Sequence, residues 1–310
     1  MIRGDFLSSF HYAETYNRPA IHRSHMAGSR ARYGEIDWNE VWRARQKRHE
    51  SSKHFEDPSH NWNRKENAER YNEGSKGEFD NRVKMTLAGL DITKKSRVLD
   101  IGAGPGTLAL PLAPLVKEIT AVEPGKGMVA LLKENMRKEG IRNITCVTKL
   151  WEDVDPEKDL AAPYDIVLCS LALTMEDLRE SLAKMDAVSS RYVYIFWFAD
   201  PPFWERMYID LWPDLHGEPY YPGPRADCLF NVLYQMGIYA NVEMLPLDKV
   251  YRFSTEKEMT AFFRRRFGVK SQKQKKVLDD YLAPLIRHGG GEVVVSGDSV
   301  LAKVWWRKAG

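Results

Sequence analysis

The 310-residue chain contains only three cysteines, Cys146, Cys169 and Cys228, and their spacing suits neither a zinc site nor a redox dithiol. It also lacks a run of about 18 uncharged apolar residues, which a membrane-spanning helix would need, and its start has no apolar secretory core. These absences argue against export. They predict a reduced, cytoplasmic setting with no metal site and no membrane partner.

No sign of charge dominates, because 46 Lys and Arg side chains stand against 43 Asp and Glu, for a formal net charge of +3. Such a balance gives no general attraction to nucleic acid. Two basic stretches, residues 43–49 and 262–276, could hold an RNA backbone locally. A solvated helix face explains them as well, and the near-neutral total favours that explanation.

The first 90 residues differ from the rest of the chain. Residues 1–26 have no periodicity and end in Ser-His-Met, so we interpret them as a disordered leader or a remnant of a cloning tag. The polar segment that follows carries spaced aromatic residues, which predicts helices that lay rings on a neighbouring surface. For Trp38 and Trp42 we expect packing rather than ligand contact.

From Ser96 onward, short β-rich runs alternate with helical stretches, which is typical of βαβ units and a parallel sheet. We expect strands at 97–101, 118–123, 144–148, 164–170 and 192–198, with helices at 107–116, 126–139 and 175–187. An insertion rich in aromatic residues and proline, at about 200–240, is expected to cap a pocket. Beyond it we expect a strand at 241–253, helices at 255–267 and 274–287, and a terminal hairpin around Gly297-Asp298 that closes the sheet edge.

The most informative stretch is RVLDIGAGPGTLALPLA, residues 97–113. A buried strand leads through Asp100 into three glycines that permit a tight turn and close backbone approach to a ligand, before a helix begins near Thr107. The dinucleotide fingerprint G-x-G-x-x-G is not met, because the third glycine comes one residue early. Asp100 places a carboxylate beside the bend, which suits a ligand amine better than a pyrophosphate.

The next strand ends at Glu123, where a carboxylate can accept both hydroxyls of a ribose. Dehydrogenases share this feature, so a dinucleotide-binding oxidoreductase stays open as an alternative. Glu123 and Asp100 could instead cap neighbouring helices. Their placement at two strand ends beside the glycines favours a ligand site.

The stretches VLDIGAGPGTLALPLA, ITAVEPGKGMVALLKENM and YDIVLCSLALTMEDL together resemble class I S-adenosylmethionine-dependent methyltransferases, over roughly residues 62–198. The resemblance implies an α/β fold with a doubly wound, seven-stranded, mostly parallel sheet whose last strand is reversed. It implies S-adenosylmethionine as the cofactor. It also implies an N-terminal helical lid at 27–90, as in small-molecule members, before a Rossmann-like domain at 91–310.

The same resemblance assigns residues to the cofactor. Asp100, Gly102 and Gly104, together with Ala103 and Gly106, match the glycine loop at the methionine part. Glu123 matches the ribose acid, Pro124 follows it, and Met128 matches the apolar residue against adenine. Trp151 and Glu152 fall at further adenine positions, although Leu150 and Lys149 stand where the family more often has Asp preceded by Gly. Ser170 and Leu171 match the loop beneath the reactive methyl, and Tyr71 in WNRKENAERY matches a lid residue.

Methyl transfer from a sulfonium is an in-line displacement, so the protein must supply alignment and, for a protonated acceptor, a base. In the insertion, His216 could be that base, and Tyr220 and Tyr221 could form an aromatic wall for a cationic or planar acceptor. The loop HGEPYYPGP could equally be a rigid segment whose tyrosines pack on the domain.

The tetrapeptide Asp200-Pro201-Pro202-Phe203 resembles the Asp/Asn-Pro-Pro-aromatic motif of enzymes that methylate amino groups on bases or amides. In those enzymes the motif follows the fourth strand, whereas here it follows the fifth. We therefore interpret the prolines as a hinge that ends the strand and starts the insertion. Phe203 and Trp204 are then expected to begin the wall of an acceptor pocket.

The sequence thus predicts an S-adenosylmethionine-dependent methyltransferase, of EC 2.1.1 type, with a small-molecule acceptor. Methylation of RNA or of a protein side chain stays open, and so does a cofactor-binding protein that acts through partners without transferring a methyl group. The sequence defines neither the acceptor nor the oligomeric state.

Overall fold

The computed structural model describes residues 36–52, 62–64, 66 and 78–308. The chain divides into two units, Met1–Ile36 and Asp37–Gly310, and everything below concerns the second. The predicted leader and Tyr71 lie outside the described residues. The predicted domain boundaries at residues 26 and 90 stay predictions.

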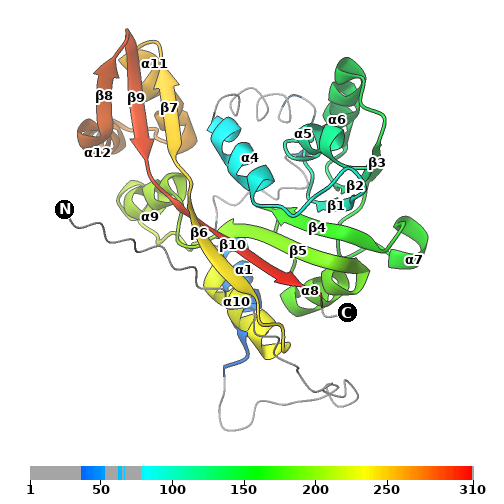
Figure 1. Cartoon of the computed structure of the whole chain (residues 1–310). Helices are drawn as coiled ribbons and strands as arrows, with labels where there is room; N and C mark the ends of the chain where they lie inside the picture. The colour runs from blue at the N-terminus through cyan, green and yellow to red at the C-terminus, as the bar shows by residue number, and fades with distance from the viewer. Residues whose placement is uncertain (1–35, 53–61, 65, 67–77, 309–310) are drawn as a thin grey trace, which may run out of the picture. The chain divides into compact units, whose positions relative to one another are not determined.

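Seven strands form the main sheet, in the order β3-β2-β1-β4-β5-β10-β6 (Figure 1). They are β1 (Arg97–Ile101), β2 (Glu118–Val122), β3 (Ile144–Val147), β4 (Tyr164–Ser170), β5 (Ser189–Phe198), β6 (Asn241–Pro246) and β10 (Val300–Arg307). The first five pair in parallel, whereas β10 runs antiparallel to both β5 and β6. The predicted seven-stranded sheet with a reversed last strand is confirmed.

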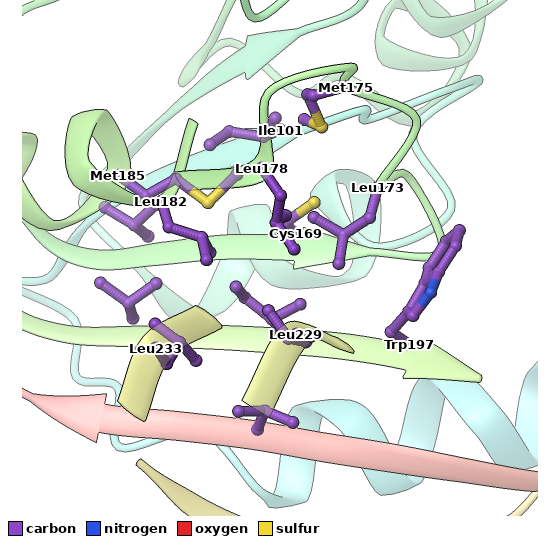
Figure 2. Close-up of a cluster of buried hydrophobic side chains, with 14 of the residues drawn as sticks. Ile101, Cys169, Leu173, Met175, Leu178, Leu182, Met185, Trp197, Leu229 and Leu233 are labelled. Carbon is purple, nitrogen blue, oxygen red and sulfur yellow. The ribbon is translucent and has the colours of Figure 1, made fainter. Parts of the chain in front are cut away.

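Helices cover both faces of this sheet, as parallel strands buried on both sides require. One face carries α1 (Trp38–Glu50), α8 (Leu178–Val188) and α10 (Ala226–Gln235), and the other carries α4 (Glu78–Ala88), α5 (Ala109–Leu112), the short η2 (Ala113–Leu115) and α6 (Lys126–Glu139). Figure 2 shows leucines of α8 and α10 gathered around Cys169 of β4 on the first face. The one-turn α7 (Pro156–Asp159) lies between β3 and β4. Within the described ranges, no helix is both long and apolar enough to cross a membrane.

Trp42 of α1 packs as expected. Its side chain is fully buried in the core beside Trp197, with 6.2 Å between ring centroids, and its indole N–H donates to the carbonyl of Met175 at 2.8 Å. Burial of a large ring with its polar N–H satisfied fixes α1 against the sheet. Trp42 is therefore part of the core, and Trp38, which is partly buried, packs against it.

The structure differs from the prediction between β6 and β10. A second, three-stranded antiparallel sheet stands there in the order β7-β9-β8, and helices pack on it (Figure 1). Its elements are β7 (Lys249–Phe253), α11 (Glu256–Arg266), α12 (Gln272–Leu282), η3 (Ala283–Leu285), β8 (Ile286–Gly289) and β9 (Glu292–Gly297). We call residues 249–297 the small subdomain. The single strand expected at 241–253 is thus two strands in different sheets.

The predicted terminal hairpin is wrong for the same reason. β9 and β10 follow one another across Asp298-Ser299, but β9 pairs with β7 and β8, and β10 pairs with β5 and β6. An alternating apolar pattern predicts that a segment is a strand. It does not say which strand is its partner, because pairing depends on residues far away in the sequence.

The proline pair does end β5 and start a new helix, α9 (Phe203–His216), with Pro202 as its N-cap at φ −65°. The backbone N–H of Phe203 donates to the Ser299 hydroxyl at 2.8 Å, and its ring lies in the core shared by α9 and the small subdomain. Phe203 therefore holds α9 to the small subdomain, and its expected place in an acceptor pocket is wrong.

Gly297 gives this junction a testable property. A Cβ at Gly297 would lie 2.1 Å from a ring carbon of Phe203, which is itself buried and cannot move aside freely. We expect Gly297→Ala to lower the free energy of unfolding by about 1–3 kcal/mol through overpacking. Urea unfolding measures this, with Gly289→Ala as the matched control, since a Cβ there meets nothing within 4 Å. Equal stability of both variants would contradict the expected packing.

Candidate functional site

A cavity of about 290 Å³ lies at the carboxyl ends of β1, β2 and β4. We call it the first cavity. The predicted cofactor residues that line it are Asp100, Gly102, Ala103, Gly104, Glu123, Pro124, Met128, Trp151, Glu152, Ser170 and Leu171. Gly106 does not line it, and packs against Leu110 and Leu132 instead. Residues far apart in the sequence thus meet where the strand ends predict.

Two glycines of the loop have a positive φ, but the space around them differs. At Gly102, φ is +73° and a Cβ would lie 2.1 Å from the Cβ of Ala172, so a side chain is excluded by both backbone and space. At Gly104, φ is +55°, and a Cβ would meet nothing within 4 Å. The loop therefore leaves open space beside its backbone at Gly104.

Glu123 is fixed by the backbone around it. Its Oε2 accepts from the N–H of Gly104 at 2.9 Å, and its Oε1 accepts from the N–H of Gly125 at 2.7 Å. Burial raises the pKa of this carboxyl, and the two hydrogen bonds oppose that rise. Each oxygen retains a further lone pair, so the carboxylate can accept a second pair of donors, as two hydroxyls would supply.

Asp100 is 2% exposed, and its Oδ2 has no hydrogen-bond partner among the described residues. Burial, together with the nearby Glu123, raises the pKa of Asp100 to about 7, while Arg82 acts in the opposite direction. A buried carboxylate oxygen without a partner is costly, unless a ligand supplies the donor. S-adenosylmethionine carries an ammonium that could donate to Oδ2 of Asp100. It also carries two ribose hydroxyls that could donate to the two oxygens of Glu123.

Arg82 of α4 lines the same cavity and was missed by the sequence analysis. It is buried, and its Nη1 donates to the Ser170 hydroxyl at 3.1 Å. No motif surrounds it in the sequence, and a lone arginine in a polar helix is usually solvated. Leu171 follows with φ +57°, a backbone conformation that non-glycine residues rarely adopt and that often marks a functional loop.

A second cavity, of about 540 Å³, adjoins the first. The two share Trp62, Glu123, Pro124, Leu150, Glu152 and Thr174. The second cavity is further lined by residues of α1 (Gln46, His49, Glu50), by the end of β5 and the start of α9 (Trp197, Phe198, Pro202, Trp204, Glu205, Tyr208), and by the following loop (Tyr220, Gly223, Pro224, Arg225). Trp204 thus lies where an acceptor pocket was expected, while neighbouring Phe203 does not.

Tyr220 is the one predicted catalytic residue that lines this cavity. Its hydroxyl donates to Oε1 of Glu205 at 3.2 Å, and its ring stacks on Tyr208 with 5.4 Å between centroids. Burial, and the charge of Glu205, raise the pKa of Tyr220. Glu205 also forms a buried ion pair with Arg225. Tyr220 therefore keeps its hydroxyl proton and contributes its ring to the cavity lining, and Glu205 and Tyr208 fix its position.

The other two predicted catalytic residues are not among those that line either cavity. The His216 ring packs against that of Trp212 in a tilted arrangement, with 4.0 Å between centroids, and its Nε2 lies 2.9 Å from the carbonyl oxygen of Phe267. The ring of Tyr221 lies 3.9 Å beneath the guanidinium of Arg48. The His49 imidazole donates through Nδ1 to the Tyr221 carbonyl at 2.8 Å, so this stretch fastens α1 to the insertion.

Comparisons with known proteins find similarity to methyltransferases over the stretch that contains the glycine loop and Glu123. Residues 98–195 match a family described as "Methyltransferase domain". A Haemophilus influenzae protein, called only an uncharacterized protein, is 26% identical over 254 residues, which are 82% of this chain and 91% of that protein. A probable ribosomal RNA small subunit methyltransferase A from Methanosphaera stadtmanae is 38% identical over only 68 residues, 22% of this chain and 25% of that protein.

Among solved structures, the YcgJ protein from Bacillus subtilis matches 74% of this chain and 98% of its own, with a TM-score of 0.49 and 16% identity. The stretch that matches the family runs from β1 into β5 and contains the glycine loop, Glu123 and the loop after β4. The main sheet of this chain has the strand order of class I methyltransferases. Over residues 98–195 this chain is similar to methyltransferase domains, a similarity that implies S-adenosylmethionine as the methyl donor.

Proposed function

We propose that the protein is an enzyme of EC 2.1.1 type that transfers a methyl group from S-adenosylmethionine to a small molecule bound in the second cavity. The observation that carries this proposal is the cavity itself. Its volume, about 540 Å³, lies within the range of small-molecule sites, and it opens beside the cofactor cavity across shared residues. Its concave shape suits a compact acceptor.

In this proposal the first cavity positions the cofactor. Asp100 pairs with the ammonium, the backbone from Gly102 to Gly104 lies against the methionine part, and Glu123 accepts the ribose hydroxyls. Met128 and Trp151, both nearly fully buried, pack against the adenine. When bound, S-adenosylmethionine supplies a methyl group that its sulfonium makes electrophilic.

The second cavity contributes proximity and the exclusion of water. Trp204 and Tyr220 wall the acceptor, and the Glu205–Arg225 pair holds Tyr220 in place. His216 receives no role here, since it packs against the small subdomain. We keep the cytoplasmic location as part of the proposal, supported by Cys146, Cys169 and Cys228, all of which are free.

The basic stretch at 43–49 supports a small molecule over RNA. Arg43 pairs with Asp177 at 2.7 Å, Arg45 with Asp227 at 2.8 Å, and Lys47 with Glu176 at 3.0 Å. These charges are already matched by carboxylates of neighbouring elements, so they add little attraction for phosphate. RNA is the alternative acceptor, because the Methanosphaera protein is a probable ribosomal RNA methyltransferase. The similarity to that protein covers only 22% of this chain, and the test below includes RNA as an outcome.

In the test, the full chain is incubated with S-adenosylmethionine that carries a labelled methyl group. One reaction contains a low-mass cell extract and a separate reaction contains total RNA. We expect label in a low-mass product and none in RNA, and no transfer by Glu123→Ala. Label in RNA would replace the proposed acceptor class. Tight S-adenosylmethionine binding without transfer to any fraction would favour a binding protein, and binding of NADH in its place would favour an oxidoreductase.

A further inference from the structure

We infer that the acceptor carries a cationic group, such as an ammonium, which the second cavity holds between aromatic rings and carboxylates. The inference rests on the proposed function and names the chemical class of its substrate. It is carried by two independent features of the cavity, its ring lining and its balance of charges.

Aromatic rings form a large part of the cavity lining. In the part of the chain that the structure describes, six aromatic side chains line the cavity: Trp62, Trp197, Phe198, Trp204, Tyr208 and Tyr220. Trp197 and Phe198 lie 5.1 Å apart between centroids, and Phe198 meets Trp204 edge to face at 5.6 Å. An aromatic ring attracts a cation placed over its face through its quadrupole, most strongly where water is excluded.

The charged side chains that line the second cavity also favour a cationic acceptor. Among the described residues, four carboxylates line the cavity, those of Glu50, Glu123, Glu152 and Glu205, against one guanidinium, that of Arg225. Glu205 takes up that guanidinium in a buried ion pair, and the carbonyl of Pro224 accepts a further bond from it at 3.3 Å. The pair is therefore neutral as a whole.

The remaining three carboxylates have no cationic partner among the ion pairs of the described residues. Glu50 accepts from the neutral amide of Gln46 at 2.8 Å, and Glu123 accepts from backbone N–H groups. Bound S-adenosylmethionine adds one net positive charge, which offsets one carboxylate at most. Glu50 and Glu152 are exposed and Glu123 is buried, so solvent screens part of their attraction, but the sign of the field is the same at all three: an acceptor cation is favoured and an anion is repelled.

The cation anchors the acceptor while it stays charged. A protonated or quaternary nitrogen has no lone pair with which to attack the sulfonium methyl. The nucleophile is therefore a separate atom of the acceptor, or the same nitrogen after it has lost a proton.

The experiment compares two probes of the same shape, (3-hydroxyphenyl)trimethylammonium and the neutral 3-tert-butylphenol, by calorimetric titration of the full chain saturated with S-adenosylhomocysteine. We expect the cation to bind at least about ten-fold more tightly at low ionic strength, and this preference to shrink in high salt. Glu50→Gln keeps the bond from Gln46 and is expected to weaken the cation roughly two- to three-fold, without affecting the phenol. Glu157→Gln, an exposed carboxylate on α7, is the matched control and should change neither affinity.

Equal or tighter binding of the phenol, or no binding of the cation, to protein that binds S-adenosylhomocysteine would overturn the inference and leave the proposed function standing. An equal effect of Glu50→Gln on both probes would also overturn it. If S-adenosylhomocysteine itself fails to bind, the proposed function fails first.

Discussion

Glu123→Ala is expected to weaken the affinity for S-adenosylmethionine about 100-fold. The carboxylate accepts one backbone N–H at each oxygen, and Glu123 lines the first cavity. Hydrogen bonds to a charged group contribute about 1.5–3 kcal/mol each, and 1.4 kcal/mol is tenfold in affinity. Loss of two hydroxyl contacts therefore accounts for the effect, and calorimetric titration measures it.

Glu123→Gln removes the charge and one of the two acceptor oxygens. The amide retains one acceptor oxygen, so we expect a loss of about ten-fold, between those of the native protein and the alanine variant. Glu157→Ala is the control for a change in net charge, because this exposed carboxylate lies on α7, away from both cavities. An unchanged affinity in a folded Glu123→Ala protein would remove Glu123 from the cofactor site.

The cofactor side of the site was predictable because its chemistry is local in the sequence. Asp100 and Glu123 stand at the ends of two buried apolar runs, and the carboxyl ends of parallel strands meet at one edge of a sheet. The glycines mark where the backbone takes positive φ. Short stretches of neighbouring residues thus predict each strand, turn and helix. The fold class then predicts that Asp100, the glycines and Glu123 lie close together.

The acceptor side was not predictable in the same way. Glu205 and Arg225 are 20 residues apart, and α1 brings Gln46 and His49 to the same cavity from a distant part of the chain. Arg82 reaches Ser170 across 88 residues. Such contacts depend on how helices pack on a sheet, for which one sequence supplies no local pattern. The expectation that His216 is a base rested on its residue type alone, which says nothing of where the side chain lies.

The affinity for S-adenosylmethionine is expected to fall steeply below pH 7 because of Asp100. Its pKa is raised to about 7 by burial, with Glu123 adding to the rise, so a lower pH leaves the carboxyl neutral and unable to pair with the cofactor ammonium. Binding must then ionise it, which costs about 1.4 kcal/mol for each pH unit below its pKa. Between pH 7.5 and pH 5.5 we expect roughly a 20-fold loss, measured by titration. Asp100→Asn should bind weakly and with a much flatter pH profile, and a profile as steep as the native one would place the titrating group elsewhere.

The same substitution should stabilise the protein at pH 8. A carboxyl whose pKa rises from 3.8 in the unfolded chain to about 7 in the native state makes the native state bind the extra proton between these values. Stability is therefore lost as pH rises from 3.8 to 7, and the cost stays constant above pH 7, on the order of a few kcal/mol. Asp100→Asn removes the charge and this cost, so its melting temperature should exceed the native one at pH 8, and the gain should vanish near pH 4. A lower melting temperature at pH 8 would show that Asp100 stabilises the fold, and that its burial does not serve the ligand.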